Sequence, residues 1–242
     1  MSGQSEESPL GKEANMVKLG GFSEVEVLRR AKEAYDRGEA KVPLRPDKTA
    51  LLVVDMLDEF VKPNWSPYWV PEATRQAPKI RFLQEVCRKL GVPVINIGYD
   101  TSMMGKNFPA TLACVPIGSG LDEFAGELFT KAAFYPEVAP KPGDLILLKH
   151  AYTSFYGTPL ETLLRNLGAD TVIVCGTVTN YCCGATAREA FWRGFKVVFG
   201  SDINSSDDEE CHRAELRTMR RGYARVIRAD EIIKELTENA KQ

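Results

Sequence analysis

The chain has 242 residues, of which 44% are hydrophobic, and its 31 basic against 33 acidic side chains leave a formal charge of -2. The length favours one large α/β domain with a short N-terminal extension. The balanced charge gives no reason to expect nucleic acid or a membrane surface as a partner. No apolar run approaches the roughly 20 residues of a transmembrane helix, and the polar, acidic N-terminus is unlike a secretory signal. We therefore expect a cytoplasmic protein.

The cysteines and histidines do not form a recognisable metal-binding pattern. Six cysteines are spread unevenly and no C-x-x-C pair occurs, so thiols are favoured over a disulfide framework in an intracellular protein. His150 and His212 lie in unrelated segments. We therefore expect neither a metal nor a cofactor.

Residues 1–45 are predicted to form an N-terminal arm with one helix. Val25, Leu28, Ala31 and Tyr35 recur at helical spacing, and Ser23 is a plausible N-cap. The arm either packs on the surface of its own domain or reaches a neighbouring subunit, and the sequence leaves both interpretations open.

Residues 46–242 are predicted to form the domain itself, in which apolar strands alternate with helices. Strands are expected over residues 49–55, 91–98, 145–149, 171–176, 195–200 and 224–227. Helices are expected around residues 75–90, 159–168, 181–194, 208–221 and 229–239. Strands that are apolar throughout indicate a parallel sheet covered on both faces. Right-handed crossovers then predict an α/β fold, a doubly wound three-layer α-β-α sandwich.

Three reactive side chains fall at the carboxyl ends of these strands, where open parallel sheets bind their ligands. Asp55 follows the first strand, Lys149 ends the third and Cys182 follows the fourth. Taken singly, the Asp could be a turn residue, the Lys a solvated one and the Cys an inert core residue. Together they supply a nucleophile, a cation that favours its thiolate and a carboxylate that can accept a proton.

The surroundings of Cys182 strengthen this interpretation. It lies in GTVTNYCCGATAREAF, near the first turn of an expected helix. Backbone N–H groups there lack intrahelical partners, and the helix dipole favours a thiolate. Cys183 would point about 100° away on a helix, so we interpret it as a packing residue.

Three blocks of the chain resemble the isochorismatase-like cysteine hydrolases, a superfamily of small-molecule amidohydrolases. They are ALLVVDMLDEF, LLKHAYTSFYGTPLETLLRNLG and VIVCGTVTNYCCGATAREAFWRGFKVVF, and the similarity runs from about residue 46 to 235. The resemblance implies the same fold and a catalytic triad of Asp55, Lys149 and Cys182. It also implies a cis peptide bond between Thr177 and Val178, and an oxyanion hole made of the N–H groups of Val178 and Cys182. The implied reaction cleaves a C–N amide or ureido bond through a thioester and releases ammonia or an amine.

The chain departs from the family pattern at three places. Leu57 replaces the usual glutamine of the first block, which predicts an altered pocket wall and not lost chemistry. GYDTSMMGKNFPA offers Asp100 without the histidines of a metal-dependent nicotinamidase. SDINSSDDEE lacks the arginine expected where the substrate carries a free carboxylate.

The pocket is expected to combine aromatic and small polar groups, which suits a compact neutral amide or ureido substrate. The aromatic candidates for its wall are Phe60, Trp65, Tyr68, Trp69, Tyr152 and Phe155. The polar candidates are Thr153, Ser154, Asn180 and Tyr181. The aromatic, proline-rich loop 62–72 is either a lid, a contact in a homo-oligomer or filler beside the first strand.

Two other functions stay open at this stage. A vinyl-ether hydrolase of the isochorismatase type would not need a thiol nucleophile, and the presence of Cys182 argues against it. A non-catalytic binding protein on the same fold would not need all three reactive side chains. The basic stretch RTMRRGYARVIR follows the acidic SDDEE, so a solvated helix face explains it better than a nucleic-acid site.

Overall fold

The computed structural model describes residues 20–36, 38, 40–99 and 133–240. The chain divides into two compact units, Met1–Arg37 and Gly38–Gln242. In the first unit, α1 (Glu24–Asp36) begins where predicted, because the Ser23 hydroxyl accepts a hydrogen bond from the Glu26 N–H at 3.2 Å. Nowhere in the described ranges is there a helix long and apolar enough to cross a membrane.

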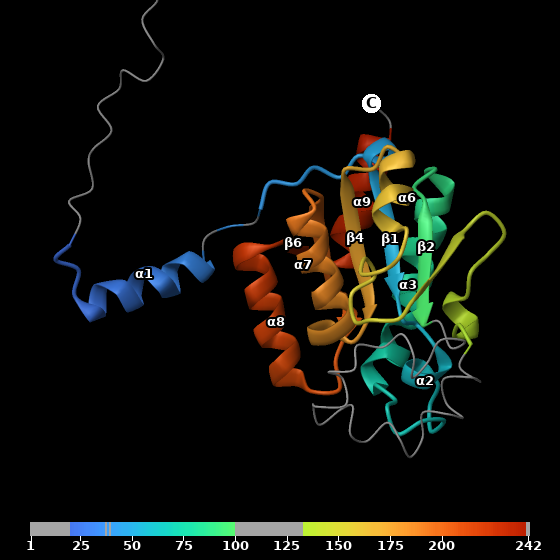
Figure 1. Cartoon of the computed structure of the whole chain (residues 1–242), viewed down its shortest axis with the longest axis horizontal. Coiled ribbons are helices and arrows are strands. Elements are labelled where there is room, and N and C mark those ends of the chain that lie inside the picture. The colour runs from blue at the N-terminus through green and yellow to red at the C-terminus, as the bar shows by residue number, and fades with distance from the viewer. Residues whose placement is uncertain (1–19, 37, 39, 100–132, 241–242) are drawn as a thin grey trace, which may run out of the picture. The chain divides into compact units, whose positions relative to one another are not determined.

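The second unit is built on one six-stranded sheet (Figure 1). Its strands are β1 (Thr49–Val54), β2 (Val94–Tyr99), β3 (Leu145–Lys149), β4 (Thr171–Thr177), β5 (Lys196–Ser205) and β6 (Arg225–Ile227). They lie in the order β3-β2-β1-β4-β5-β6 and every neighbouring pair is parallel. The predicted doubly wound α/β fold is confirmed.

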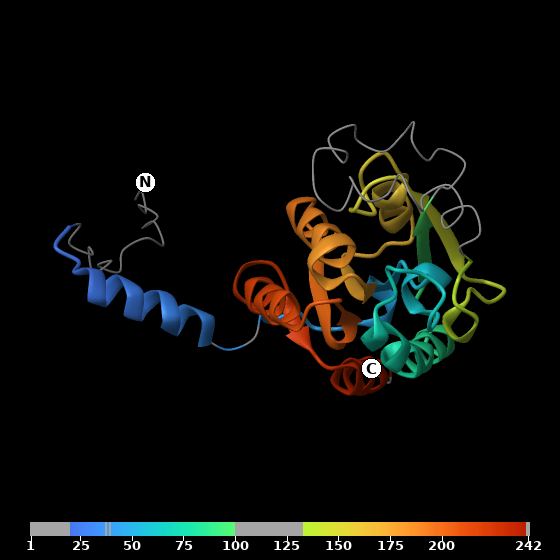
Figure 2. The ribbon, with the colours of Figure 1, turned by 90° about the horizontal axis from the view of Figure 1, so that it is seen from below.

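Helices cover both faces of the sheet, which is why its central strands are apolar throughout (Figure 2). One face packs against α3 (Pro71–Lys89) and α9 (Ala229–Asn239), and the other against α6 (Leu160–Asn166), α7 (Gly184–Trp192) and α8 (Glu209–Gly222). Along β1 the side chains alternate between the two faces. Leu51 and Val53 pack on the side of α3 and α9, while Leu52 and Val54 pack on the side of α6, α7 and α8. Shorter elements are α2 (Asp58–Val61) and two 3-10 turns, Pro46–Lys48 and Pro136–Val138.

Several boundaries differ from the sequence-based expectation, and β2, for example, begins at Val94 and not at residue 91. Helix α3 begins at Pro71 because a proline suits the first helical turn, and it continues through Pro78. Strand β5 runs on to Ser205 after a register shift against β4. Leu44, which the expected boundary puts in the arm, is a buried core residue of the second unit, and its N–H bonds Glu235 at 2.9 Å.

The topology brings the ends of β1 and β4 together. The connections leave these two neighbouring strands in opposite directions, which makes the gap between them the switch point of the sheet. Gly176 allows the close approach, since a Cβ there would lie 1.9 Å from the Val54 carbonyl oxygen. Its φ of +127° also suits glycine alone. The residues that follow β1 and β4 therefore lie next to each other.

Candidate active site

Asp55 and Lys149 form a buried ion pair at the carboxyl edge of the sheet. Asp55 follows β1 with a left-handed φ of 50°, and Lys149 is the last residue of β3. Both side chains are fully buried, and Lys149 Nζ lies 2.9 Å from Asp55 Oδ2. The structure thus brings together two of the three predicted residues.

Cys182 completes the group. It lies in a single π-helical turn, Thr179–Cys183, that leads into α7, so the helix containing it starts less regularly than the sequence suggests. Lys149 Nζ donates to Cys182 Sγ at 3.5 Å and to the carbonyl oxygen of Ala151 at 2.9 Å. The ion pair with Asp55 is a third contact of the amine, and the three contacts together hold it in position.

Tyr99 belongs to the same cluster, although the sequence analysis did not single it out. It is the last residue of β2 and the register partner of Lys149. Its hydroxyl lies 3.2 Å from Cys182 Sγ, and Lys149 Nζ lies 3.8 Å from the centre of its ring. Burial, followed by the charge of Cys182, raises the pKa of Tyr99 well above its usual value, so its hydroxyl keeps its proton. Its place at a strand end is the signal that could have found it.

Burial dominates the protonation of this cluster. It raises the pKa of Cys182 to about 12 and outweighs the opposing charge of Lys149. Burial also raises the pKa of Asp55 against the same lysine. For Lys149 burial works against the charged form, but Asp55 and Cys182 raise its pKa. Lys149 lowers the pKa of Cys182, as expected from the sequence, although burial acts more strongly. The buried site favours a thiol beside an Asp55–Lys149 ion pair.

The peptide bond between Thr177 and Val178 is cis, at the position that the resemblance implies. The Val178 carbonyl then accepts hydrogen bonds from the N–H groups of Tyr181 and Cys183, at 3.1 and 3.2 Å. These bonds hold the turn that carries Cys182. Cys183 is buried in the core, in agreement with its interpretation as a packing residue.

Of the predicted pocket residues, Phe60, Tyr152 and Tyr181 have contacts close to the cluster. The Phe60 ring lies 6.4 Å from that of Tyr99. The rings of Tyr152 and Tyr181 lie 5.5 Å apart, and Cys182 contributes to a raised pKa of Tyr152, whose main cause is burial.

Other predicted pocket residues have structural partners. Trp65 lies under Lys62, with 5.8 Å between the amine and the ring centre, and Asn180 accepts a hydrogen bond from Ser206 at 2.8 Å. Phe155 is buried in the core against Phe195, with 6.1 Å between ring centres, and we do not retain it as a pocket residue.

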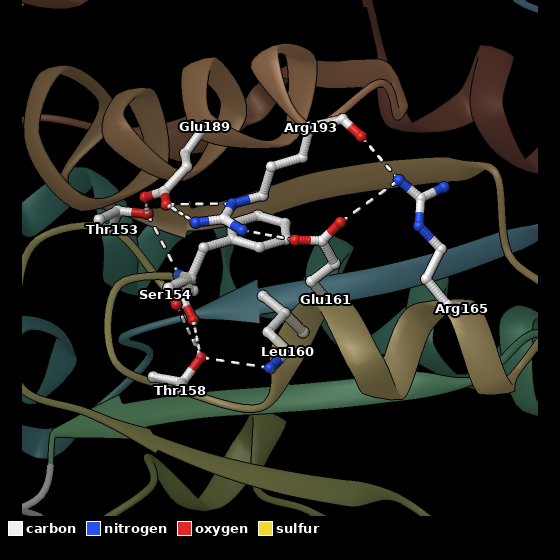
Figure 3. A network of polar contacts seen from close by, with 9 residues as sticks. Thr153, Ser154, Thr158, Leu160, Glu161, Arg165, Glu189 and Arg193 are labelled. Atoms are coloured by element: carbon white, nitrogen blue, oxygen red, sulfur yellow. Dashed lines mark hydrogen bonds and ion pairs between the residues drawn. The ribbon is translucent and has the colours of Figure 1, made fainter.

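Thr153 and Ser154, which were predicted to bind substrate, also have structural partners. Thr153 donates to Glu189 of α7 at 2.5 Å, and Glu189 in turn pairs with Arg193 (Figure 3). Arg193 also pairs with Glu161 of α6. This network ties the loop that follows Lys149 to both helices, so these side chains hold the loop in place.

Thr186 supports the same loop from within the core. Its hydroxyl accepts the Ser154 N–H at 3.0 Å and lies 2.9 Å from the Ser154 hydroxyl, and both residues are fully buried. We expect Thr186→Val to lower the free energy of unfolding by about 2 kcal/mol, because it leaves two buried polar groups unpaired. Thr218→Val on the exposed side of α8 is the matched control and should change it by less than about 0.5 kcal/mol. Urea titration of both variants measures the difference, and equal values would contradict the role of Thr186.

Glu59 is a second buried carboxyl near the ion pair. It lies in α2 with 1% of its surface exposed, and its Oε2 has no hydrogen-bond partner in the described part of the chain. Burial, and then the charge of Asp55, raise the pKa of Glu59 to about 8. The sequence analysis did not identify Glu59.

This raised pKa predicts a pH-dependent loss of stability. The unfolded chain releases the Glu59 proton near pH 4.5 and the folded one near pH 8, so the folded state loses stability as pH rises between these values. Glu59→Gln cannot ionise. It should therefore gain stability over the wild type between pH 5 and 9, by on the order of 5 kcal/mol. Urea denaturation at several pH values tests this, and a pH-independent difference between the two proteins would refute it.

Leu57 and Asp100 belong to two of the places where the chain departs from the family pattern. Leu57 is buried, and both it and Phe134 lie 3.4 Å from where a Gly98 Cβ would be, so it fills the core beside the site. Asp100 lies outside the described residues. No group of three His, Cys, Asp or Glu side chains among those described is arranged to hold a metal ion.

Fold and site together define a class of protein. It is a three-layer α/β protein in which Cys182, Lys149 and Asp55 cluster at the carboxyl edge of the sheet, close to its switch point. The family model of the isochorismatase domain matches residues 49–231. Nicotinamidase 3 of Arabidopsis thaliana is 30% identical over 198 residues, covering 78% of this chain and 89% of that protein. The isochorismatase of Bacillus subtilis is 29% identical over 207 residues, covering 84% and 63%.

A solved structure supports the same assignment. The crystal structure of a cysteine hydrolase from Pseudomonas syringae pv. phaseolicola has a TM-score of 0.76 and 27% identity, and the match covers 84% of this chain and 99% of that one. The chain belongs to the isochorismatase family of hydrolases.

Proposed function

We propose that the protein hydrolyses a C–N amide or ureido bond of a small molecule, with Cys182 as the nucleophile. The observation that carries the proposal is the buried contact of Cys182 Sγ with Lys149 Nζ at 3.5 Å, next to the 2.9 Å ion pair of Lys149 with Asp55. A thiol beside a fixed cation and a carboxylate base is the arrangement that nucleophilic cysteine catalysis requires.

The reaction begins with proton transfer. Because burial keeps Cys182 protonated, Asp55 takes the thiol proton as sulfur attacks the carbonyl carbon. Lys149 stays charged between Asp55 and Cys182. It stabilises the negative charge on the Asp55 carboxylate or on the Cys182 sulfur, whichever is ionised. Tyr99 donates a hydrogen bond to the thiolate from the end of the neighbouring strand β2.

The same proton then serves the leaving group. The tetrahedral intermediate collapses, the C–N bond breaks, and Asp55 returns the proton to the departing nitrogen, which leaves as ammonia or an amine. Asp55 next takes a proton from water, hydroxide attacks the thioester, and the thiolate leaves with that proton. The backbone N–H groups of Val178 and Cys182 are the proposed donors to the oxyanion, each worth about 3 kcal/mol in such sites.

The substrate proposed is compact and neutral. Phe60, Tyr152 and Tyr181 supply aromatic surface near the cluster, with the ring contacts described above. The loop over residues 201–210 carries no arginine for a substrate carboxylate. The name of the Arabidopsis relative, a nicotinamidase, supports amide chemistry.

The second candidate is vinyl-ether hydrolysis, which the match to the isochorismatase of Bacillus subtilis favours. Trapping an intermediate distinguishes the two reactions. The wild type is mixed with primary amides, ureides, biuret and nicotinamide, ammonia release is measured, and acid-quenched enzyme is digested for mass spectrometry. We expect an acyl group on the peptide that carries Cys182. Turnover of isochorismate without any adduct, and no turnover of the amides, would refute the proposal.

A further inference from the structure

A cleft of about 600 Å³ lies beside the turn that carries Cys182. Its walls come from the start of α3, the end of β5 with the loop after it, and the start of α8. Neither Asp55 nor Lys149 lines it. The proposed reaction does not use this cleft.

Two buried polar atoms of the cleft wall lack partners. Gln76 is 5% exposed and Ser205 is 1% exposed, yet neither Gln76 Oε1 nor Ser205 Oγ has a hydrogen-bond partner among the described residues. A buried polar atom left unpaired costs about 1–3 kcal/mol. A ligand that donates hydrogen bonds would recover this free energy.

The charges of the cleft favour a cation. Asp202 pairs with Lys79 at 3.0 Å and Glu72 with Arg75 at 2.6 Å. Asp207 also lines the cleft, and the ion pairs of the described residues give it no cation. The Ser206 hydroxyl oxygen lies 3.1 Å from Asp207 Oδ1 and 2.8 Å from Asn180 Oδ1, and its single hydrogen can serve only one of them at a time.

We propose that this cleft binds a primary ammonium group, carried by a small amine or by a lysine side chain. An ammonium has three N–H donors and no acceptor. Gln76 Oε1 and Ser205 Oγ are two acceptors without a donor, and the Asp207 carboxylate supplies the opposite charge. A metal ion fits less well, because these side chains include only one ionised ligand.

The cleft is joined to the turn of Cys182 by side-chain contacts. His212, on its wall, lies with Nδ1 2.9 Å from the Thr179 hydroxyl, and Ser206 donates to Asn180 at 2.8 Å. Burial lowers the pKa of His212, with the charges of Glu72 and Glu209 opposing it. His212 is therefore neutral near pH 7 and does not repel a cation. These contacts reach Thr179 and Asn180 of the turn that carries Cys182.

The test uses the whole 242-residue chain and measures binding, not substrate turnover. Its result is therefore independent of the proposed reaction. The chain has two histidines, and His150 is not part of the cleft, so the ring signals of His212 can be followed by NMR. Methylammonium chloride is titrated at constant ionic strength, and tetramethylammonium chloride, which has no N–H donor, is the control. We expect a saturable shift of the His212 signal with methylammonium alone. Nα-Acetyl-lysine amide is titrated in the same way, and the tighter of the two ligands identifies the source of the ammonium.

Variants test the three acceptors. Asp207→Asn and Ser205→Ala should each weaken methylammonium binding about tenfold or more, the effect of one charge-assisted hydrogen bond. Gln76→Leu should do the same, and thermal unfolding checks that each variant folds. Glu231→Gln on α9, outside the cleft, is the control and should leave binding unchanged. Equal shifts with both salts, no saturable shift, or unchanged binding in Asp207→Asn would overturn the proposal.

Discussion

Cys182→Ala is expected to lower the rate of ammonia release by about four orders of magnitude or more, since no other described thiol can replace it. Cys183 is adjacent but buried in the core, and Cys175 points its Sγ to the Leu52 carbonyl at 3.6 Å. Burial raises the pKa values of both thiols, and neither has a hydrogen bond to Lys149 among the described contacts.

The matched control is Cys183→Ala, which removes the neighbouring thiol from the same turn. It should keep the rate within several-fold of the wild type, because Cys183 only packs. Wild-type turnover by Cys182→Ala would eliminate the mechanism. Labelling with iodoacetamide should be done in a Cys211→Ser background, because Cys211 is exposed and would react first.

The fold was predictable because its signal is repeated in the central strands. Strands such as TALLVV and TVIVCGT are apolar throughout and buried throughout, so their number, order in the chain and parallel arrangement follow from burial on both faces. The reactive cluster follows from the same logic. Once the strands are parallel, residues directly after them meet at one edge, and this alone brings Asp55 to Lys149.

What was missed depends on the direction of individual side chains. Tyr99 is the last residue of its strand, as Lys149 is, but a tyrosine at a strand end can just as well be a core residue. Only the register of β2 against β3 places its hydroxyl next to the sulfur of Cys182. Phe155 was one of the aromatic candidates for the pocket wall. The hydrogen bonds of Ser154 to Thr186 instead orient the loop so that the ring enters the core.

The strength of the burial effect on Cys182 could not be predicted from the sequence for a different reason. Sequence identifies the charges that stand near a thiol, but not how deeply water is excluded from it. Here the exclusion outweighs the lysine and raises the pKa of Cys182 to about 12. In the proposed reaction Asp55 removes this proton, so we expect its pairing with Lys149 to matter for both activity and stability.

Lys149→Met is expected to abolish activity and to lower the free energy of unfolding by about 3–5 kcal/mol, because it leaves Asp55 as a buried charge without a partner. Asp55→Asn should be destabilising in the same way, since it leaves the lysine unpaired. The double variant Asp55→Asn with Lys149→Met removes both charges, and its loss of stability should be clearly smaller than the sum of the two single losses.

Activity separates the two roles of the pair. The double variant should recover much of the stability and none of the ammonia release, because it has neither a proton acceptor nor a cation beside Cys182. Urea denaturation of the four proteins at pH 7 gives the coupling free energy, and the ammonia assay gives the rates. Additive losses of stability would mean that the two charges do not interact in the folded protein. Activity in the double variant would mean that Cys182 is deprotonated by another group.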